Sequence, residues 1–168
     1  MKKQYLLILL TLLLFSCGGS KSTTKTNKNT TTKRVSKTSS SSKAESIISY
    51  AESFKGTRYK FGGTTSKGMD CSGLVYVSFQ KEQIALPRVS RDMATRGKRV
   101  SLSQSKKGDL VFFKTNKNKN VINHVGLVVA SKNGNVTFIH SSSSRGVIVS
   151  SLDENYWKRA FVEVRRII

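Results

Sequence analysis

The spacing of apolar residues changes at Gly108, and this change narrows the folds that the chain can adopt. Before Gly108, apolar residues recur at helical spacing, and Ile47, Ile48 and Ala51 predict a helix over residues 45–54. After it, short β-branched and aromatic runs alternate with turn residues, which is typical of strands. Strands are expected at 109–113, 125–130, 136–139, 146–149 and 160–168. Helices followed by antiparallel strands indicate an α+β domain.

Residues 71–81 fit two patterns. The alternation of apolar residues over 75–79 is typical of a strand, whereas the wider spacing that begins at Cys71 also fits one face of a helix. Asp70 and Ser72 stand just before the apolar run, and such polar residues favour a capped helix start. We therefore predict a helix with Cys71 in its first turn.

Residues 1–17 have the pattern of a secretory signal. Two lysines precede an apolar run over residues 5–15, which as a helix would span about half of a bilayer core. The run leads to Cys17, directly after a small residue, and this resembles the lipobox of bacterial lipoproteins. We expect lipidation of Cys17 after cleavage; a plain signal peptide cut nearby is the alternative.

Residues 18–43 differ in composition from the rest of the chain. They are almost entirely Ser, Thr, Lys, Asn and Gly, with Val35 as the one aliphatic residue and no acid. Such a segment cannot bury enough apolar surface to offset its chain entropy. We expect a disordered tether there, followed by one domain over residues 44–168, which is long enough to form a core.

The chain is strongly basic, with a formal charge of +21. Residues 44–168 hold 21 Lys or Arg and 9 Asp or Glu, a net charge of +12. A basic surface suggests an acidic partner, and an exported protein meets cell-wall polymer and anionic lipid headgroups. Nucleic acid is not expected, because of export and because no Lys/Arg-rich helix interleaved with aromatic residues is present. A solvated surface without a specific partner is the alternative, and we expect a monomer.

Cys71 is left without a disulfide partner if Cys17 carries lipid. A helix start stabilises a thiolate, so Cys71 is a candidate nucleophile; burial as an inert apolar residue is the alternative. The only histidines are His124 and His140. A cysteine at a helix start and histidines on an antiparallel sheet are the arrangement of papain-like hydrolases. Zinc sites usually bring two ligands close in sequence, so we expect no metal and no other cofactor.

The two histidines can act together only if they project from the same face of adjacent strands. Opposed residues in an antiparallel hairpin have a constant sum of residue numbers. A two-residue turn at Asn133-Gly134 would pair Leu127 with His140 and place His124 on the opposite face. We therefore expect a three- or five-residue loop, or a β-bulge, despite the Asn-Gly turn signal.

Five sequence blocks occur in an order and spacing typical of one family. They are Asp-Cys-Ser-Gly-Leu-Val at 70–75, Leu-Pro-Arg-Val-Ser at 86–90, Lys-Gly-Asp-Leu-Val-Phe-Phe at 107–113, His-Val-Gly at 124–126 and Phe-Ile-His at 138–140. Over essentially all of residues 44–168 the chain resembles the NlpC/P60 family of cell-wall cysteine peptidases. The stretch 143–157 is similar to the lipoprotein branch of murein endopeptidases in this family.

The resemblance implies a role for each matching residue. Cys71 would be the nucleophile, His124 the general base, and His140 the third polar group that orients His124. The substrate cleft would be lined by Tyr59, Asp70, Ser72, Arg88 and Ser90. Simple packing of Tyr59, helix capping by Asp70, and a plain surface loop at Arg88 and Ser90 are the alternatives.

The resemblance also implies the substrate, which is the peptide stem of peptidoglycan, cleaved through an acyl-enzyme. The lipoprotein branch implies the D-Ala–meso-diaminopimelate cross-link, whereas the wider family implies the γ-D-Glu–diaminopimelate bond within one stem. The implied location is a bacterial membrane, with the outer membrane facing the periplasm favoured. A non-catalytic wall-binding lipoprotein, or another amide hydrolase or acyltransferase on this fold, are the rival interpretations.

Overall fold

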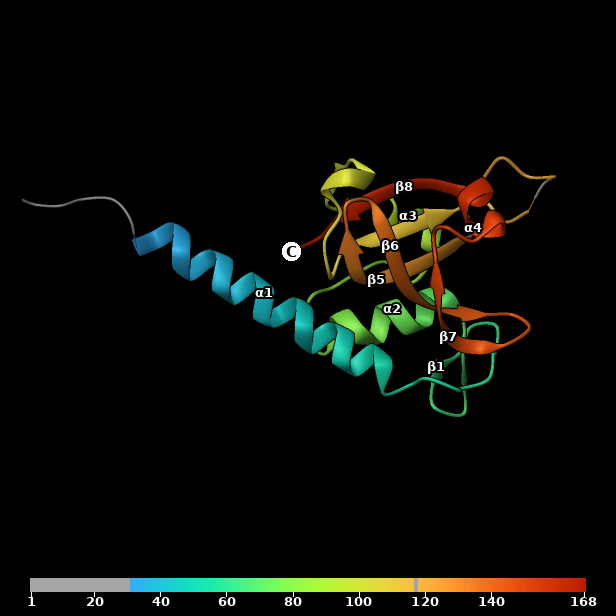
Figure 1. Cartoon of the computed structure of the whole chain (residues 1–168). Helices are drawn as coiled ribbons and strands as arrows, with labels where there is room; N and C mark the ends of the chain where they lie inside the picture. The colour runs from blue at the N-terminus through green and yellow to red at the C-terminus, as the bar shows by residue number, and fades with distance from the viewer. Residues whose placement is uncertain (1–30, 117) are drawn as a thin grey trace, which may run out of the picture. The chain divides into compact units, whose positions relative to one another are not determined.

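Six strands form one antiparallel sheet in the order β3-β8-β4-β5-β6-β7 (Figure 1). They are β3 (Lys98–Val100), β4 (Leu110–Phe113), β5 (His124–Lys132), β6 (Asn135–Ser142), β7 (Gly146–Ser151) and β8 (Phe161–Arg166). A separate hairpin pairs β1 (Thr64–Thr65) with β2 (Gly68–Met69). The strands expected after Gly108 are confirmed, and the order of helices and then antiparallel strands confirms the α+β class.

The structure is a computed structural model that describes residues 31–116 and 118–168. The predicted signal over residues 1–17, its Cys17 and the tether residues 18–30 lie outside the described residues. Among the described residues, no helix is both long enough and apolar enough to cross a membrane.

The helices are α1 (Thr31–Glu52), α2 (Cys71–Gln80), α3 (Ser90–Met93) and α4 (Asn155–Ala160), with a short 3₁₀ turn at Leu102–Gln104. The helix predicted to start at Cys71 is confirmed as α2. Helices α1 and α2 cover one face of the sheet, where Ile47 and Phe79 share a buried cluster with Phe112 and Leu127. The other face buries Phe113, Phe138 and Trp157. Each face of the sheet therefore has its own apolar core.

Helix α1 corrects the expected boundary of the tether. The sequence predicts disorder over residues 18–43 and a helix over 45–54, but the helix begins at Thr31 and ends at Glu52. Its last turns are anchored by Ile47, Ile48 and Ala51, which are all buried. Once packing has formed these turns, each further residue adds one hydrogen bond without the cost of a new nucleus. The composition of the segment does not reveal that the last turns of the helix are held by packing against the domain.

The β5–β6 hairpin confirms the expected irregularity. It does close with the two-residue turn Asn133-Gly134, whose positive φ angles of 53° and 84° suit a tight hairpin turn. A register shift between Val128 and Ala130 then changes the pairing, so that Leu127 pairs with Ile139. This bulge restores an even sum of residue numbers, and His124 and His140 project from the same face of the sheet.

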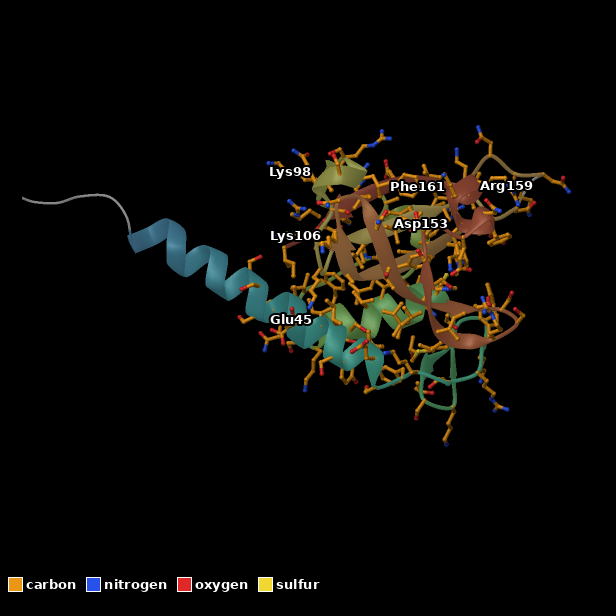
Figure 2. The ribbon with its side chains drawn as sticks, in the orientation of Figure 1. Glu45, Lys98, Lys106, Asp153, Arg159 and Phe161 are labelled. Carbon is orange, nitrogen blue, oxygen red and sulfur yellow. The ribbon has the colours of Figure 1, made fainter. Side chains whose placement is uncertain are left out.

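Basic side chains are exposed on several elements of the domain. Lys98 on β3, Lys106 before β4 and Arg159 on α4 all lie at the surface (Figure 2). The positive charge predicted from composition is thus available to solvent or to an acidic partner.

Candidate active site

Cys71 is the first residue of α2, and the sequence around it explains why the helix begins there. The Asp70 side chain accepts a hydrogen bond of 2.6 Å from the Gly73 N–H, which caps the helix. Gly73 is required because a Cβ at this position would collide with the carbonyl oxygen of Gly63. The loop that contains Gly62 and Gly63 therefore packs directly against the first turn that carries the thiol.

The Cys71 thiol is buried, with 8% of the residue exposed, and no disulfide is formed. Burial raises the pKa of the thiol to about 11, although a hydrogen bond from the backbone N–H of Val125 acts in the opposite direction. The expectation that the helix start would stabilise a thiolate is therefore outweighed by desolvation. The Val125 contact places the sulfur against the residue that directly follows His124.

The two histidines form a hydrogen-bonded pair. Nε2 of His124 lies 3.0 Å from Nδ1 of His140, with the ring planes 80° apart. This contact leaves Nδ1 of His124 as the ring nitrogen available to another group. Nε2 of His140 in turn lies 3.1 Å from Oγ of Ser150. A continuous series of polar atoms therefore runs from His124 through His140 to Ser150.

An aromatic enclosure surrounds the histidine pair. The ring of Trp157 stacks on His124, and Phe138 lies 5.0 Å from His140 between ring centroids. Burial lowers the pKa of His124 to about 4. It also lowers the pKa of His140 to about 3, with smaller contributions from the charges of His124 and Arg145. At neutral pH both imidazoles and the Cys71 thiol are uncharged, so the site holds a thiol and a neutral base rather than an ion pair.

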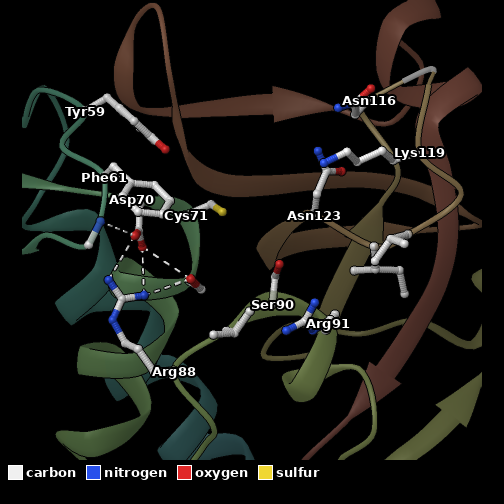
Figure 3. Close-up of a pocket in the computed structure, with 15 residues that line it drawn as sticks. Tyr59, Phe61, Asp70, Cys71, Arg88, Ser90, Arg91, Asn116, Lys119 and Asn123 are labelled. Carbon is white, nitrogen blue, oxygen red and sulfur yellow. Dashed lines mark hydrogen bonds and ion pairs between the residues drawn. The ribbon is translucent and has the colours of Figure 1, made fainter.

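A cleft of about 760 Å³ opens over the thiol (Figure 3). On one side Figure 3 shows Tyr59, Phe61 and Asp70, and on the other Asn116, Lys119 and Asn123. All five residues predicted to line a substrate cleft do line this one: Tyr59, Asp70, Ser72, Arg88 and Ser90. Phe61 stands at the cleft with 88% of its surface exposed.

Asp70 and Arg88 are joined in a dense network at one wall of the cleft. Nη1 and Nη2 of Arg88 each donate to the Asp70 carboxylate at 2.9 Å. Nη1 also donates to Oγ of Ser72 at 2.8 Å, and the Gly62 N–H donates to Asp70 at 2.7 Å. The capping alternative for Asp70 is thus realised in the structure, while the same side chain faces the cleft.

Among the residues that contact the histidine pair, Trp157 and Ser150 were not predicted from the sequence. Trp157 lies on α4, a helix of only six residues, which is too short for apolar spacing to reveal. Ser150 is one of two serines at the end of the otherwise apolar strand β7, and its position opposite Phe138 depends on strand register. The signal that could have pointed to Trp157 is that the chain has a single tryptophan.

Across residues 31–116 and 118–168, no group of three His, Cys, Asp or Glu side chains is placed to hold a metal ion. The chemistry that the described side chains can perform is transfer of a proton from a thiol to an imidazole and attack by sulfur on an electrophile in the cleft.

Several known proteins are similar to this chain in sequence. The murein DD-endopeptidase MepS/murein LD-carboxypeptidase of Escherichia coli strain K12 is 41% identical over 127 residues, which are 75% of this chain and 63% of that protein. The gamma-D-glutamyl-L-lysine dipeptidyl-peptidase of Bacillus subtilis strain 168 is 36% identical over 124 residues, or 73% of this chain and 40% of that protein. The chain thus spans less than two thirds of the length of these curated relatives.

A solved structure has the same fold. The crystal structure of an NlpC/P60 family protein from Bacillus cereus superposes with a TM-score of 0.67 at 28% identity, covering 74% of this chain and 40% of that one. The model of the NlpC/P60 family matches residues 56–166, a span that contains Cys71, both histidines and every predicted cleft residue. On this evidence the chain belongs to the NlpC/P60 family.

Proposed function

We propose that the protein is a cysteine peptidase that cleaves the peptide stems of peptidoglycan. Two observations carry this proposal: the two histidines are hydrogen-bonded to each other, and the free thiol of Cys71 lines a cleft and accepts a hydrogen bond from the N–H of Val125, the residue after His124. Cys71 acts as the nucleophile, His124 as the general base and His140 as the group that holds the His124 ring. Tyr59, Asp70, Ser72, Arg88 and Ser90 form the wall against which the peptide binds.

The reaction follows from the protonation states of the site. The neutral thiol gives its proton to Nδ1 of His124 while the sulfur attacks the peptide carbonyl carbon, and the carbonyl oxygen becomes negative. The N–H of Cys71 at the start of α2 is a donor for that oxygen, since amides in the first turn have no partner within the helix. His124 then protonates the departing amine, which leaves an acyl-enzyme.

Hydrolysis completes the cycle. A water gives a proton to His124 and attacks the thioester carbonyl, after which the C–S bond breaks and the sulfur recovers the proton. No net redox change occurs, and the products are one new amine and one new carboxylic acid. His124 must be neutral at the start of both half-reactions, which agrees with its lowered pKa.

Two bonds are candidates for cleavage. The name of the Escherichia coli relative describes a DD-endopeptidase, which supports the D-Ala–diaminopimelate cross-link. The name of the Bacillus subtilis relative describes a γ-D-glutamyl-L-lysine dipeptidyl-peptidase, which supports the bond that follows γ-D-Glu within one stem, here to diaminopimelate in place of lysine. The first is favoured because that relative is more similar in sequence. A wall-binding protein without activity is disfavoured, since it would have no need of a free thiol at the cleft and a hydrogen-bonded histidine pair.

We also propose export and anchoring through lipid on Cys17, with the outer membrane as the site. The proposal rests on the sequence pattern of residues 1–17 and on the cell-wall activities named for the relatives. Metabolic labelling of bacterial cells with an alkyne fatty acid tests it. The wild-type chain should be labelled and Cys17→Ser should not. Equal labelling of both would refute the anchor.

The activity is tested by digesting purified muropeptides with the full chain and resolving the products by mass spectrometry. Wild type should release products at one of the two bonds, and Cys71→Ala should release none. Ser78→Ala is the matched control, because Ser78 is buried on α2 and its hydroxyl bonds to the Leu74 carbonyl, away from the cleft. Equal product from wild type and Cys71→Ala would refute the proposal.

A further inference from the structure

Ser150 extends the histidine pair into the interior of the sheet. It lies on β7 opposite Phe138, while His140 is opposite Ile148, so Ser150 and His140 are diagonal neighbours on one face. Oγ of Ser150 lies 3.1 Å from Nε2 of His140. Both residues are buried, with 4% of Ser150 and none of His140 exposed. The contact is therefore sheltered from competing water.

Each imidazole is neutral at rest and carries one proton, which allows two arrangements along this series of atoms. In the first, Nε2–H of His124 donates to Nδ1 of His140, and Nε2–H of His140 donates to Ser150. In the second, Ser150 donates to Nε2 of His140, and Nδ1–H of His140 donates to Nε2 of His124. In the second arrangement the His124 proton sits on Nδ1, which then cannot accept a proton from a thiol.

The charged state of His124 allows only one arrangement. When Nδ1 of His124 gains a proton, both of its nitrogens carry hydrogen, so Nε2–H must donate to Nδ1 of His140. The single proton of His140 then sits on Nε2, and in the described part of the chain its hydrogen-bond partner is Oγ of Ser150. Ser150 must therefore act as an acceptor whenever His124 is protonated.

We propose that Ser150 is a positioning residue that accepts a hydrogen bond from His140 and so stabilises protonated His124 during the reaction. The consequence for catalysis rests on the proposed function, whereas the proton arrangement of His140 does not. Removing the hydroxyl leaves a buried N–H without a partner each time His124 is charged, and such groups are costly in protein interiors. The cost is larger in the charged state than in the resting enzyme, because only there is the first arrangement obligatory.

The first test is kinetic. Ser150→Ala should lower kcat on muropeptides about tenfold and leave KM unchanged, since the lost bond is required only after His124 is protonated. Ser150→Thr keeps the hydroxyl and should recover most of the loss, while Ser78→Ala, which deletes an equally buried hydroxyl, should behave as wild type. An unchanged kcat in a folded Ser150→Ala, or no recovery with Thr, would overturn the proposal.

The second test needs no substrate. Nitrogen-15 NMR of the imidazoles distinguishes the two neutral forms of a histidine. His140 should carry its proton on Nε2 in the wild type and shift toward Nδ1 in Ser150→Ala. A wild-type His140 that is protonated only on Nδ1 while His124 is charged would overturn the proposal even if the enzyme is active. Conversely, the protein could give the expected NMR result and cleave no muropeptide. That outcome would refute the proposed function, whereas the inferred proton arrangement of His140 would stand.

Discussion

The indole of Trp157 stacks on the imidazole of His124, with ring centroids 5.2 Å apart and planes 23° from parallel. The same indole meets His140 edge-on at 4.7 Å, so one side chain covers both rings. Burial is the cause of the lowered pKa of His124. We infer that Trp157 supplies much of this burial and keeps the proposed base neutral.

Trp157→Ala should raise the pKa of His124 from about 4 toward its ordinary value of 6.5, because the ring gains access to water. Loss of the buried indole should also lower the free energy of unfolding by about 3–5 kcal/mol. NMR titration of the His124 ring protons measures the first effect and urea unfolding the second. Tyr156→Ala is the control for loss of a neighbouring ring, since Tyr156 is 53% exposed and packs edge-on against Trp157, and no ring contact joins it to a histidine in the described chain. An unchanged His124 pKa in folded Trp157→Ala would contradict the inference.

The uncharged thiol predicts how Cys71 reacts with iodoacetamide. Because the pKa of Cys71 is about 11, the thiolate fraction should grow tenfold with each pH unit, and the alkylation rate should rise in step from pH 7 to about 10. A resting thiolate–imidazolium pair would instead give a rate that is flat over this range. Mass spectrometry of the peptide that contains Cys71 separates its alkylation from that of Cys17. A flat profile would show that the ion pair is present at rest.

The capped helix start at Cys71 was predictable because chemistry and local pattern coincide there. Cys71 follows a capping residue, and the cap is visible locally as Asp70 in front of an apolar run. The β5–β6 bulge was predictable for a different reason. Two histidines that act together must share a face of the sheet, so the numbers of paired residues must have an even sum. A regular hairpin with a two-residue turn at Asn133-Gly134 gives an odd sum and is therefore excluded.

Other features depend on information that is distant in sequence. Trp157 reaches His124 only because α4 packs on the sheet face that buries Phe113 and Phe138, and Ser150 reaches His140 only through the pairing of β6 with β7. The raised pKa of Cys71 likewise follows from tertiary burial, which a helix-start argument omits. Local sequence pattern predicts helices, strands and helix caps. Tertiary packing decides which ionisable groups lose contact with water and which side chains support the histidines.

The Asp70–Arg88 pair separates a structural role from a substrate-binding role. Asp70 holds the helix cap and both Arg88 bonds with its side chain 9% exposed. Asp70→Asn should therefore lower the free energy of unfolding by about 3 kcal/mol. Arg88→Met should cost less, about 1–2 kcal/mol, because backbone N–H groups still bind the carboxylate. Urea unfolding of both variants and the double variant measures the coupling.

Kinetics of the same variants decide between the two roles for Arg88. If Arg88 only supports Asp70, the activity of Arg88→Met should change in the same direction as the activity of Asp70→Asn. A large rise in KM for Arg88→Met with an unchanged free energy of unfolding would instead assign Arg88 to direct contact with substrate.

Gly126 leaves the space in which the aromatic enclosure is packed. A Cβ at this position would collide with the ring of Phe138, and that ring lies against His140 and Trp157. Gly126→Ala should lower the free energy of unfolding by about 1–3 kcal/mol, because a well-packed ring has no free volume to enter. Thermal or urea unfolding measures this cost.

A second substitution shows whether the cost arises at Phe138. In Gly126→Ala combined with Phe138→Leu, the smaller side chain makes room for the new methyl group, so the double variant should lose less stability than the sum of the single variants. If the losses of stability in the two single variants were additive in the double variant, the strain in Gly126→Ala would arise from contacts other than Phe138. The histidine pair provides a local readout, since a displaced Phe138 ring should shift the imidazole signals of His140 in Gly126→Ala more than in the double variant.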